Sequence, residues 1–321
     1  MGNLYHNKCL FKMNILILFC LIFSPVHGLN LTPIVNLTSG PIQGKVTEYA
    51  SIDVYQFLGI SYTKSPVGKL RLQLPVKPDS WTEVKSVTDF GPACLQPMNP
   101  VLNIPYTGKT SEDCLYLKIY VTESTFNNSS ERLRPVLFWI HGGAFTFGYG
   151  NEGNTEGIPM VPLHDVVLVT MNYRLNAFGF IYFGANEPRI PPNIGFQDQL
   201  FALKWVHENI HMFGGLFKRA ILESGTVYTD HDVDTLITDS WKLYNKTSCS
   251  KSEDVLECMQ NLTANEIMQA MILNIDDWGK TETERVEFCL KQWDYIYPHV
   301  THAMGKLNLN HVTKDVLRED N

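Results

Sequence analysis

The sequence lacks the features that mark a membrane-spanning or nucleic-acid-binding protein. Its longest apolar run extends from Met13 to Phe23, well short of the ~20 residues that a spanning helix needs. Positive charge is not clustered, and the net charge is −7 at neutral pH. A chain of this charge has no electrostatic footprint for a phosphate backbone. We therefore expect no membrane anchor and no nucleic acid partner.

Patterns for metal ions and cofactors are also lacking. His299 and His302 have a spacing that ligands use, but no third ligand lies at a sensible distance in the sequence. A zinc site needs at least three protein ligands, and a histidine in a polar stretch is more often simply solvated. We expect no metal site and no cofactor.

The N-terminal residues have the pattern of a secretory signal peptide. Lys8 and Lys12 precede the apolar run, and the small-residue end Val26-His27-Gly28 follows it. We expect residues 1–28 to be the signal and the protein to be secreted. A secreted chain can be glycosylated at Asn-x-Ser/Thr, and we expect a glycoprotein modified at Asn30, Asn36, Asn127, Asn245 and Asn261. A further sequon at Asn128 overlaps that of Asn127, so only one of the two is expected to be used.

The most informative stretch is PVLFWIHGGAFTFG, residues 135–148. The apolar run Val136 to Ile140 ends at His141-Gly142-Gly143, which predicts a strand buried on both faces of a parallel sheet. Gly142 and Gly143 can adopt backbone conformations closed to other residues and can turn their N–H groups into a cleft. There they would stabilise the oxyanion formed from an attacked carbonyl, which is half of an acyl-transfer site. Two glycines alone could equally form a tight turn after a strand.

The neighbouring segments favour the acyl-transfer interpretation. They are SEDCLYL (111–117), NYRL (172–175), FGF (178–180), FLGISYTKSPVGKLRL (57–72), NIGFQDQLFALKWVHENI (193–210) and LFKRAILESG (216–225). Together they closely resemble the type-B carboxylesterase and cholinesterase family, over roughly residues 31 to 262. The resemblance implies an α/β-hydrolase fold with a mostly parallel central sheet. It also implies hydrolysis of a carboxylic ester by a serine nucleophile through an acyl-enzyme.

The order of the predicted elements fits an α/β fold. Short apolar runs predict a meander over 31–61, and residues 62–81 are expected to be an extended connection. Apolar residues at helical spacing predict a helix over 196–210, with Asn193 as a possible N-cap and Gly214-Gly215 at its end. Further strands are predicted at 115–121, 136–140, 166–172 and 219–222, and helices at 233–244, 252–262 and 265–273. We expect residues 29–225 to form the N-terminal part of the hydrolase domain, and residues 226–321 a partial helical region with a poorly packed tail.

One difference from the family sequence pattern determines which function we predict. Relatives carry a central strand, a Gly-x-Ser-x-Gly elbow and its helix after the glycine pair that ends the long helix, whereas here Gly215 is followed directly by Leu216. The elbow holds the nucleophilic serine on a strained turn, and the next N–H completes the oxyanion hole. The family's acid and histidine motifs are not found before Asn321, and none of His231, His299, His302 and His311 has the motif context. We therefore expect an incomplete fold, without a central strand and a C-terminal portion, and no catalytic triad.

Ser224 is the remaining nucleophile candidate, because the segment Glu223-Ser224-Gly225 superficially resembles the missing Gly-x-Ser-x-Gly elbow. Leu222 stands where the sharp turn requires glycine, and no long amphipathic helix follows at once. Without a base its hydroxyl also stays a poor nucleophile. An ordinary residue at the end of a strand is the expected role.

The resemblance further implies disulfides. Five cysteines remain after the signal, and the family closes loops that correspond to Cys94 with Cys114 and to Cys249 with Cys258. Cys289 is then left as a free thiol or as the partner of another chain. In cholinesterases the first of these loops supplies a tryptophan that stacks on the choline ammonium. This loop holds none, which argues against a choline ester substrate.

Three hypotheses follow. The first is a secreted carboxylesterase-family protein that is catalytically inactive, with a carboxylic ester as the substrate of the full-length family. The second is a non-catalytic binding protein like the cholinesterase-like adhesion proteins. The third is an incomplete gene product whose longer form is an active esterase.

Overall fold

The computed structural model describes residues 29–96, 109–128, 132–143, 145–151, 157–216 and 233–272. The chain divides into a unit of residues 1–30 and a unit of residues 31–321, and the elements below belong to the second. Several sequence predictions lie outside the described residues. These are the strand at 219–222, Ser224, Cys289, the tail and the histidines His231, His299, His302 and His311.

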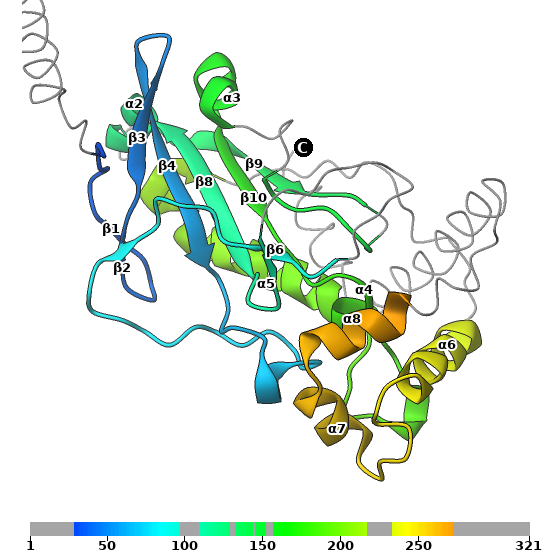
Figure 1. Cartoon of the computed structure of the whole chain (residues 1–321). Coiled ribbons are helices and arrows are strands. Elements are labelled where there is room, and N and C mark those ends of the chain that lie inside the picture. The colour runs from blue at the N-terminus through cyan, green and yellow to red at the C-terminus, as the bar shows by residue number, and fades with distance from the viewer. Residues whose placement is uncertain are drawn as a thin grey trace, which may run out of the picture. The chain divides into compact units, whose positions relative to one another are not determined.

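A six-stranded sheet forms the centre of the second unit (Figure 1). Its strand order is β11-β9-β10-β8-β4-β3. The strands are β3 (Lys45–Tyr49), β4 (Ile52–Ser61), β8 (Tyr116–Thr122), β9 (Arg134–Ile140), β10 (Val167–Met171) and β11 (Gly215–Leu216). Two smaller sheets accompany the central one. One has the order β1-β2-β5, with β1 (Val35–Asn36), β2 (Pro41–Gln43) and β5 (Lys85–Ser86), and the other pairs β6 (Ala93–Cys94) with β7 (Thr110–Ser111).

The prediction of a mostly parallel sheet holds for only one half of it. Strands β9, β10 and β11 run parallel, whereas β3, β4 and β8 join their neighbours antiparallel. The reason lies in the connections. Ala50 and Ser51, with φ of 51° and 63°, form a two-residue turn between β3 and β4, and such turns join antiparallel strands. The parallel half is the half that bears the glycine motif.

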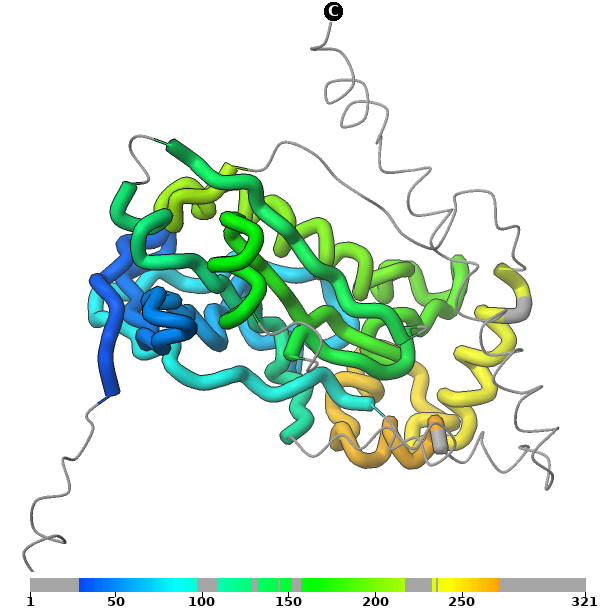
Figure 2. The backbone as a smooth tube through the Cα atoms, turned by 90° about the horizontal axis from the view of Figure 1, so that it is seen from above, coloured from blue at the N-terminus to red at the C-terminus, as the bar shows by residue number. Residues whose placement is uncertain are grey.

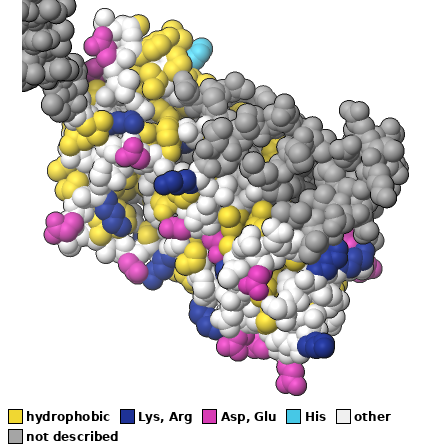
Figure 3. Space-filling model, in the orientation of Figure 1, with side chains coloured by type: hydrophobic (Ala, Val, Ile, Leu, Met, Phe, Trp, Pro, Cys, Tyr) yellow, Lys and Arg dark blue, Asp and Glu magenta, His cyan; other side chains and the backbone are white. Residues whose placement is uncertain are grey.

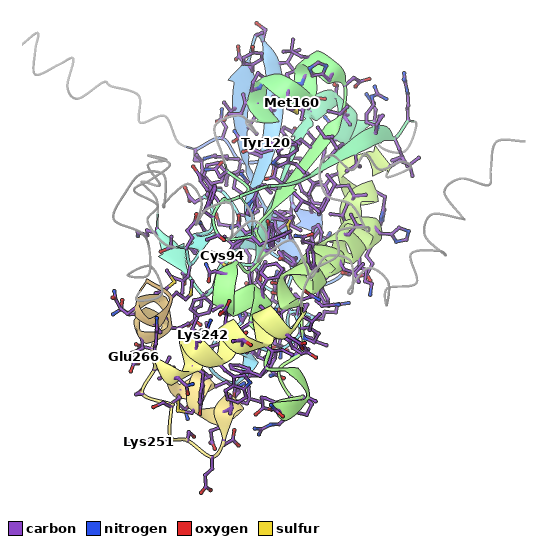
Figure 4. The ribbon with its side chains drawn as sticks, turned by 90° about the vertical axis from the view of Figure 1, so that its right-hand side faces the viewer. Cys94, Tyr120, Met160, Lys242, Lys251 and Glu266 are labelled. Atoms are coloured by element: carbon purple, nitrogen blue, oxygen red, sulfur yellow. A yellow bond between two sulfur atoms is a disulfide. The ribbon has the colours of Figure 1, made fainter. Side chains whose placement is uncertain are left out.

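Helices cover both faces of the central strands. Side chains alternate between faces along a strand, and Ile119 and Val169 belong to the core cluster that includes Trp205 of α5 (Ile194–Asn209). The next residues along, Tyr120 and Leu168, pack instead with Val161 of α3 (Gly157–His164). Figure 4 labels Tyr120 and Met160 where α3 meets the sheet. The short elements α2 (Glu123–Asn127), α4 (Asn176–Phe180), η1 (Gly68–Leu70), η3 (Gly184–Asn186) and η4 (Ile210–Phe213) complete this part.

The long helix begins and ends close to its predicted bounds, but one cap differs from expectation. Asn193 precedes α5 in a left-handed conformation with φ of 60°, and its side chain caps no N–H group. Gly214, with φ of 76°, ends η4 after the helix. Glycine adopts this left-handed conformation without a steric cost. Gly215 already belongs to β11.

Strand β9 is not buried on both faces, which corrects the sequence prediction. Val136 and Phe138 pack against the main core cluster, on the α5 side of the sheet. The alternate residues Leu137 and Trp139 are each 41% exposed. Two causes are visible in the described residues: α3 packs mainly on β8, β10, β4 and β3, and β11 pairs only with Arg134 and Pro135. An apolar strand therefore stands near the edge of the sheet.

The C-terminal helices form where the sequence predicts them. They are α6 (Val233–Asn245), α7 (Val255–Asn261) and α8 (Ala264–Ile272). Figure 1 shows them near α4, and Figure 2 shows the same helices, in yellow and orange, grouped together. Leu243, Met259 and Ile267 pack in a second apolar cluster with Phe178 and Phe183. Asp254 caps α7 by accepting the N–H of Glu257 at 2.8 Å. These helices are thus tied to the segment that follows β10.

Both expected disulfides are present, joining Cys94 to Cys114 and Cys249 to Cys258. The five asparagines expected to carry glycans are all exposed. Over the face shown in Figure 3, Lys and Arg side chains are interspersed with Asp and Glu. Among the described residues, no helix combines the length and apolar character needed to cross a bilayer.

Candidate active site

The candidate site is the loop that follows β9, at the carboxyl end of the parallel strands. Gly143 has φ of 106° and Phe145 has φ of 58°, so the chain turns sharply here. The carbonyl of Gly143 accepts the N–H groups of Thr146 at 3.0 Å and Phe147 at 3.1 Å. A Cβ on Gly143 would lie 2.1 Å from the Phe147 carbonyl oxygen. The turn therefore requires glycine at position 143.

Gly142 is set differently from Gly143. It is exposed, and a Cβ built on it would meet nothing within 4 Å. Within the described residues, neither the N–H of Gly142 nor that of Gly143 donates a hydrogen bond. Two neighbouring N–H donors without partners are what an oxyanion hole requires.

His141 is a buried residue that contacts this loop, and the sequence analysis did not predict this role. It is 3% exposed, and its ring stacks on that of Tyr173 with centroids 4.5 Å apart. Its Nδ1 lies 2.9 Å from the Gly142 carbonyl oxygen. Burial lowers the pKa of His141 to about 4, helped by the charge of Lys118 and opposed by the contact with Gly142. The ring is therefore neutral at physiological pH, and its place directly before the glycine pair was the available signal.

Two side chains from other segments fix the far end of the loop. Gln96 donates to the Gly148 carbonyl at 3.1 Å and accepts the Gly148 N–H at 2.9 Å. Gln96 follows Cys94, so the disulfide to Cys114 holds it close to the sheet. Asn172, at the end of β10, accepts the Gly150 N–H at 2.8 Å. The glycine loop is thus supported on both sides before any ligand binds.

The other motif residues that carry the resemblance have structural roles. Arg174 donates two side-chain hydrogen bonds to Asp198 of α5, from Nε at 2.8 Å and from Nη2 at 2.6 Å. Both side chains are buried, at 5% and 0% exposed. Arg71 and Glu112 form a second such pair at 2.6 Å. Arg174 thereby joins the loop after β10 to α5, whereas Arg71 and Glu112 both belong to loops.

No catalytic group joins the glycines among the described residues. Residues 217–232, which include Ser224, lie outside them. Within the described ranges no cluster of three or more His, Cys, Asp or Glu residues is arranged to hold a metal ion. The arrangement can stabilise a developing negative charge, and it contains no described nucleophile beside it.

Comparisons with known proteins agree with this geometry. The model of the carboxylesterase family matches residues 31–215. The para-nitrobenzyl esterase of Bacillus subtilis (strain 168) is 40% identical over 174 residues, which are 54% of this chain and 34% of the relative. Acetylcholinesterase-1 of Trittame loki is 31% identical over 302 residues, covering 80% of this chain and 52% of the relative. A solved structure described as a thermophylic PNB esterase superposes with a TM-score of 0.66 at 28% identity, over 77% of this chain and 55% of that one. The chain therefore spans between about a third and about half of these curated relatives.

Proposed function

The chain belongs to the carboxylesterase family, and from this premise we propose that the chemistry of its site is the hydrolysis of carboxylic esters. The observation that carries the proposal is the pair Gly142 and Gly143, whose N–H groups have no partner among the described residues. Such donors stabilise the negative oxygen that forms when a nucleophile attacks an ester carbonyl. In the family chemistry a serine attacks, an acyl-enzyme forms, and water then releases the acid.

The chain with this sequence is proposed to be catalytically inactive. It contains no Gly-x-Ser-x-Gly segment, and Gly215 is followed directly by Leu216. The family match stops at residue 215, and β11 brings only these two residues beside β9. The oxyanion donors are then present without the elbow serine that they serve.

A fluorophosphonate probe, which bonds covalently to an activated serine, tests the inactivity. We expect no labelling of the full chain, and no hydrolysis of 4-nitrophenyl acetate above the uncatalysed rate. The para-nitrobenzyl esterase of Bacillus subtilis serves as the labelled control. Labelling or a burst of hydrolysis that disappears in Ser224→Ala would contradict the proposal.

The proposed role of Gly142 in the oxyanion hole is tested in a variant of the protein into which a nucleophile elbow is inserted. The strand, elbow and helix of a relative are inserted between Gly215 and Leu216, and hydrolysis is measured. In that form Gly142→Pro removes one N–H donor and should lower kcat by about 10²–10³-fold. Gly142→Ala is the matched control, because it keeps the N–H and a Cβ at this position meets nothing within 4 Å. Equal activity of the two variants would remove Gly142 from the oxyanion hole.

A second candidate is an active esterase encoded by a longer form of the same gene. The exposed Leu137 and Trp139 of β9 favour it, because they are what a further strand in this slot would cover. Sequencing the messenger RNA across the codons for Gly215 and Leu216 separates the two candidates. A transcript with a Gly-x-Ser-x-Gly segment supports the longer form, and only the short transcript supports the inactive chain. The adhesion alternative stays a prediction, to be tested by capture of a cell-surface partner.

Secretion and glycosylation complete the proposal. The exposed sequon asparagines support them, because a transferase must reach these side chains. Expression in cultured animal cells should deliver the protein to the medium. Enzymatic removal of N-linked glycans should then increase its mobility on a denaturing gel, and a chain retained in the cell without a mobility shift would contradict both statements.

A further inference from the structure

Lys118 is a buried lysine on the central sheet. It lies on β8 between Leu117 and Ile119, which are both 0% exposed, and is itself 6% exposed. Its side chain is on the face opposite to theirs, the face of Tyr120, which Figure 4 labels. A charged ammonium group that leaves water needs a compensating partner.

The described neighbours of Lys118 are polar and aromatic, but none is acidic. Its Nζ donates to Oδ1 of Asn151 at 3.0 Å and lies 4.8 Å from the centroid of the Phe90 ring. No Asp or Glu of the described residues forms an ion pair with it. Burial lowers the pKa of Lys118 to about 7. An anion beside the amine would favour its charged form.

A cavity of about 510 Å³ opens beside this amine. That volume lies within the usual ~300–1,000 Å³ of small-molecule sites. Lys109 and Lys118 both line it, and no Asp or Glu is among its described lining residues. Phe90, Tyr116 and Tyr149 supply aromatic surface. The cavity therefore places the Lys118 amine beside flat apolar walls.

We propose that this cavity binds a small organic carboxylate with an aromatic body, whose carboxylate pairs with the Lys118 ammonium. Asn151 accepts from Lys118 through its oxygen, and its amide N–H groups donate to no other described residue. They are suited to the second carboxylate oxygen, because carboxylates accept several hydrogen bonds. The aromatic walls cover the body of the ligand. Neither Gly142 nor Gly143 lines the cavity, and the test of this site needs no ester hydrolysis.

Isothermal titration calorimetry of the purified full chain with 3-phenylpropionate tests the site. We expect saturable binding of one ligand per chain. Lys118→Met leaves an unbranched, slightly shorter side chain without the charge and should weaken binding at least tenfold. The matched control is Lys85→Met, because Lys85 also lies over an aromatic ring, 3.7 Å from the centroid of Trp81, but outside the cavity. The uncharged 3-phenylpropionamide should bind at least tenfold more weakly than the acid.

A second measurement needs no variant. Sulfo-N-hydroxysuccinimidyl acetate at pH 7 acetylates amines with a low pKa, and peptide mass spectrometry locates the modified lysine. We expect Lys118 to be modified and 3-phenylpropionate to protect it, while Lys85 is not protected. The proposal is overturned if no saturable binding occurs, if acid and amide bind equally, if Lys118→Met binds like the parent, or if the ligand gives Lys118 no protection.

Discussion

The hydroxyl of Tyr173 donates to the main-chain carbonyl of His141 at 3.0 Å while the two rings stack 4.5 Å apart. The residue before the glycine pair is thus held through both its main chain and its side chain. Tyr173 belongs to the loop after β10, and His141 to the loop after β9. This relationship fixes the two loops to each other at the carboxyl ends of neighbouring parallel strands, where α/β sheets place their sites.

Removing the hydroxyl should weaken this link. Tyr173→Phe keeps the stacked ring but leaves the His141 carbonyl without this donor, and Tyr173 is only 1% exposed. An acceptor left unsatisfied in the interior costs about 1–3 kcal/mol. Urea denaturation should show that loss in the free energy of unfolding. Tyr49→Phe is the control, because Tyr49 is 37% exposed and should change stability little. Equal stabilities of the two variants would contradict the structural role of the bond.

The stability of the chain should also depend on pH through His141. Its pKa falls from 6.5 to about 4 on folding, chiefly because the ring is buried. Between these values the unfolded chain binds a proton that the folded chain does not. The neutral His141 ring therefore makes its full contribution to the free energy of unfolding above pH 6.5. This contribution is lost as the pH falls towards 4, by up to about 1.4 kcal/mol for each pH unit.

A pair of variants isolates this contribution. His141→Gln should lower stability at pH 7.5 and give a flatter decline between pH 6.5 and 4 than the parent protein. His207→Gln replaces an exposed histidine of α5 and should keep the parental slope. Carboxylates such as Glu187, whose pKa is lowered mainly by its hydrogen bonds with Arg189, are present in all three proteins and cancel in the comparison. Parallel curves for His141→Gln and the parent would show that the ring is not held neutral.

Local patterns predicted the part of the site that depends on local conformation. An apolar run followed by two glycines predicts a strand and a sharp turn, and β9 and Gly143 have these conformations. Helix α5 followed from apolar spacing for the same reason. What such patterns cannot show is the neighbour of a strand. Val136 to Ile140 has the composition of a buried strand, and only the arrangement of α3 and β11 shows that Leu137 and Trp139 are exposed.

Lys118 shows the same limit of sequence patterns in the opposite sense, because a residue expected to be exposed is buried. A lysine within an alternating strand is typical of a solvent-facing position. It is buried here because the 90–92 segment and the 149–151 segment, distant in sequence, lie around it. The buried pair of Arg174 and Asp198 likewise depends on contact between a loop and a helix 24 residues apart. Residues whose role depends on such tertiary neighbours were not predictable from periodicity.

The exposed side of β9 should promote self-association. Strands with apolar side chains and open edges pair with other chains. Trp139→Lys should reduce the rise in light scattering when the purified protein is concentrated and warmed. Leu163→Lys is the matched control, because Leu163 is 68% exposed on helix α3 and offers no strand edge. A similar reduction by both variants would assign the association to general surface hydrophobicity.

The buried pair of Arg174 and Asp198 should be the most sensitive ionic contact. Asp198 accepts from the Arg174 main-chain N–H at 3.1 Å as well as from its guanidinium, and is 0% exposed. Asp198→Asn leaves the guanidinium buried without its counter-charge, which typically costs about 3–5 kcal/mol. Asp79→Asn breaks the pair of Lys64 with Asp79, where Asp79 is 84% exposed, and should cost at most about 1 kcal/mol. Chemical denaturation of both variants measures the difference, and comparable losses would mean that Arg174 gains compensation from its other acceptor, the Gln73 carbonyl at 2.8 Å.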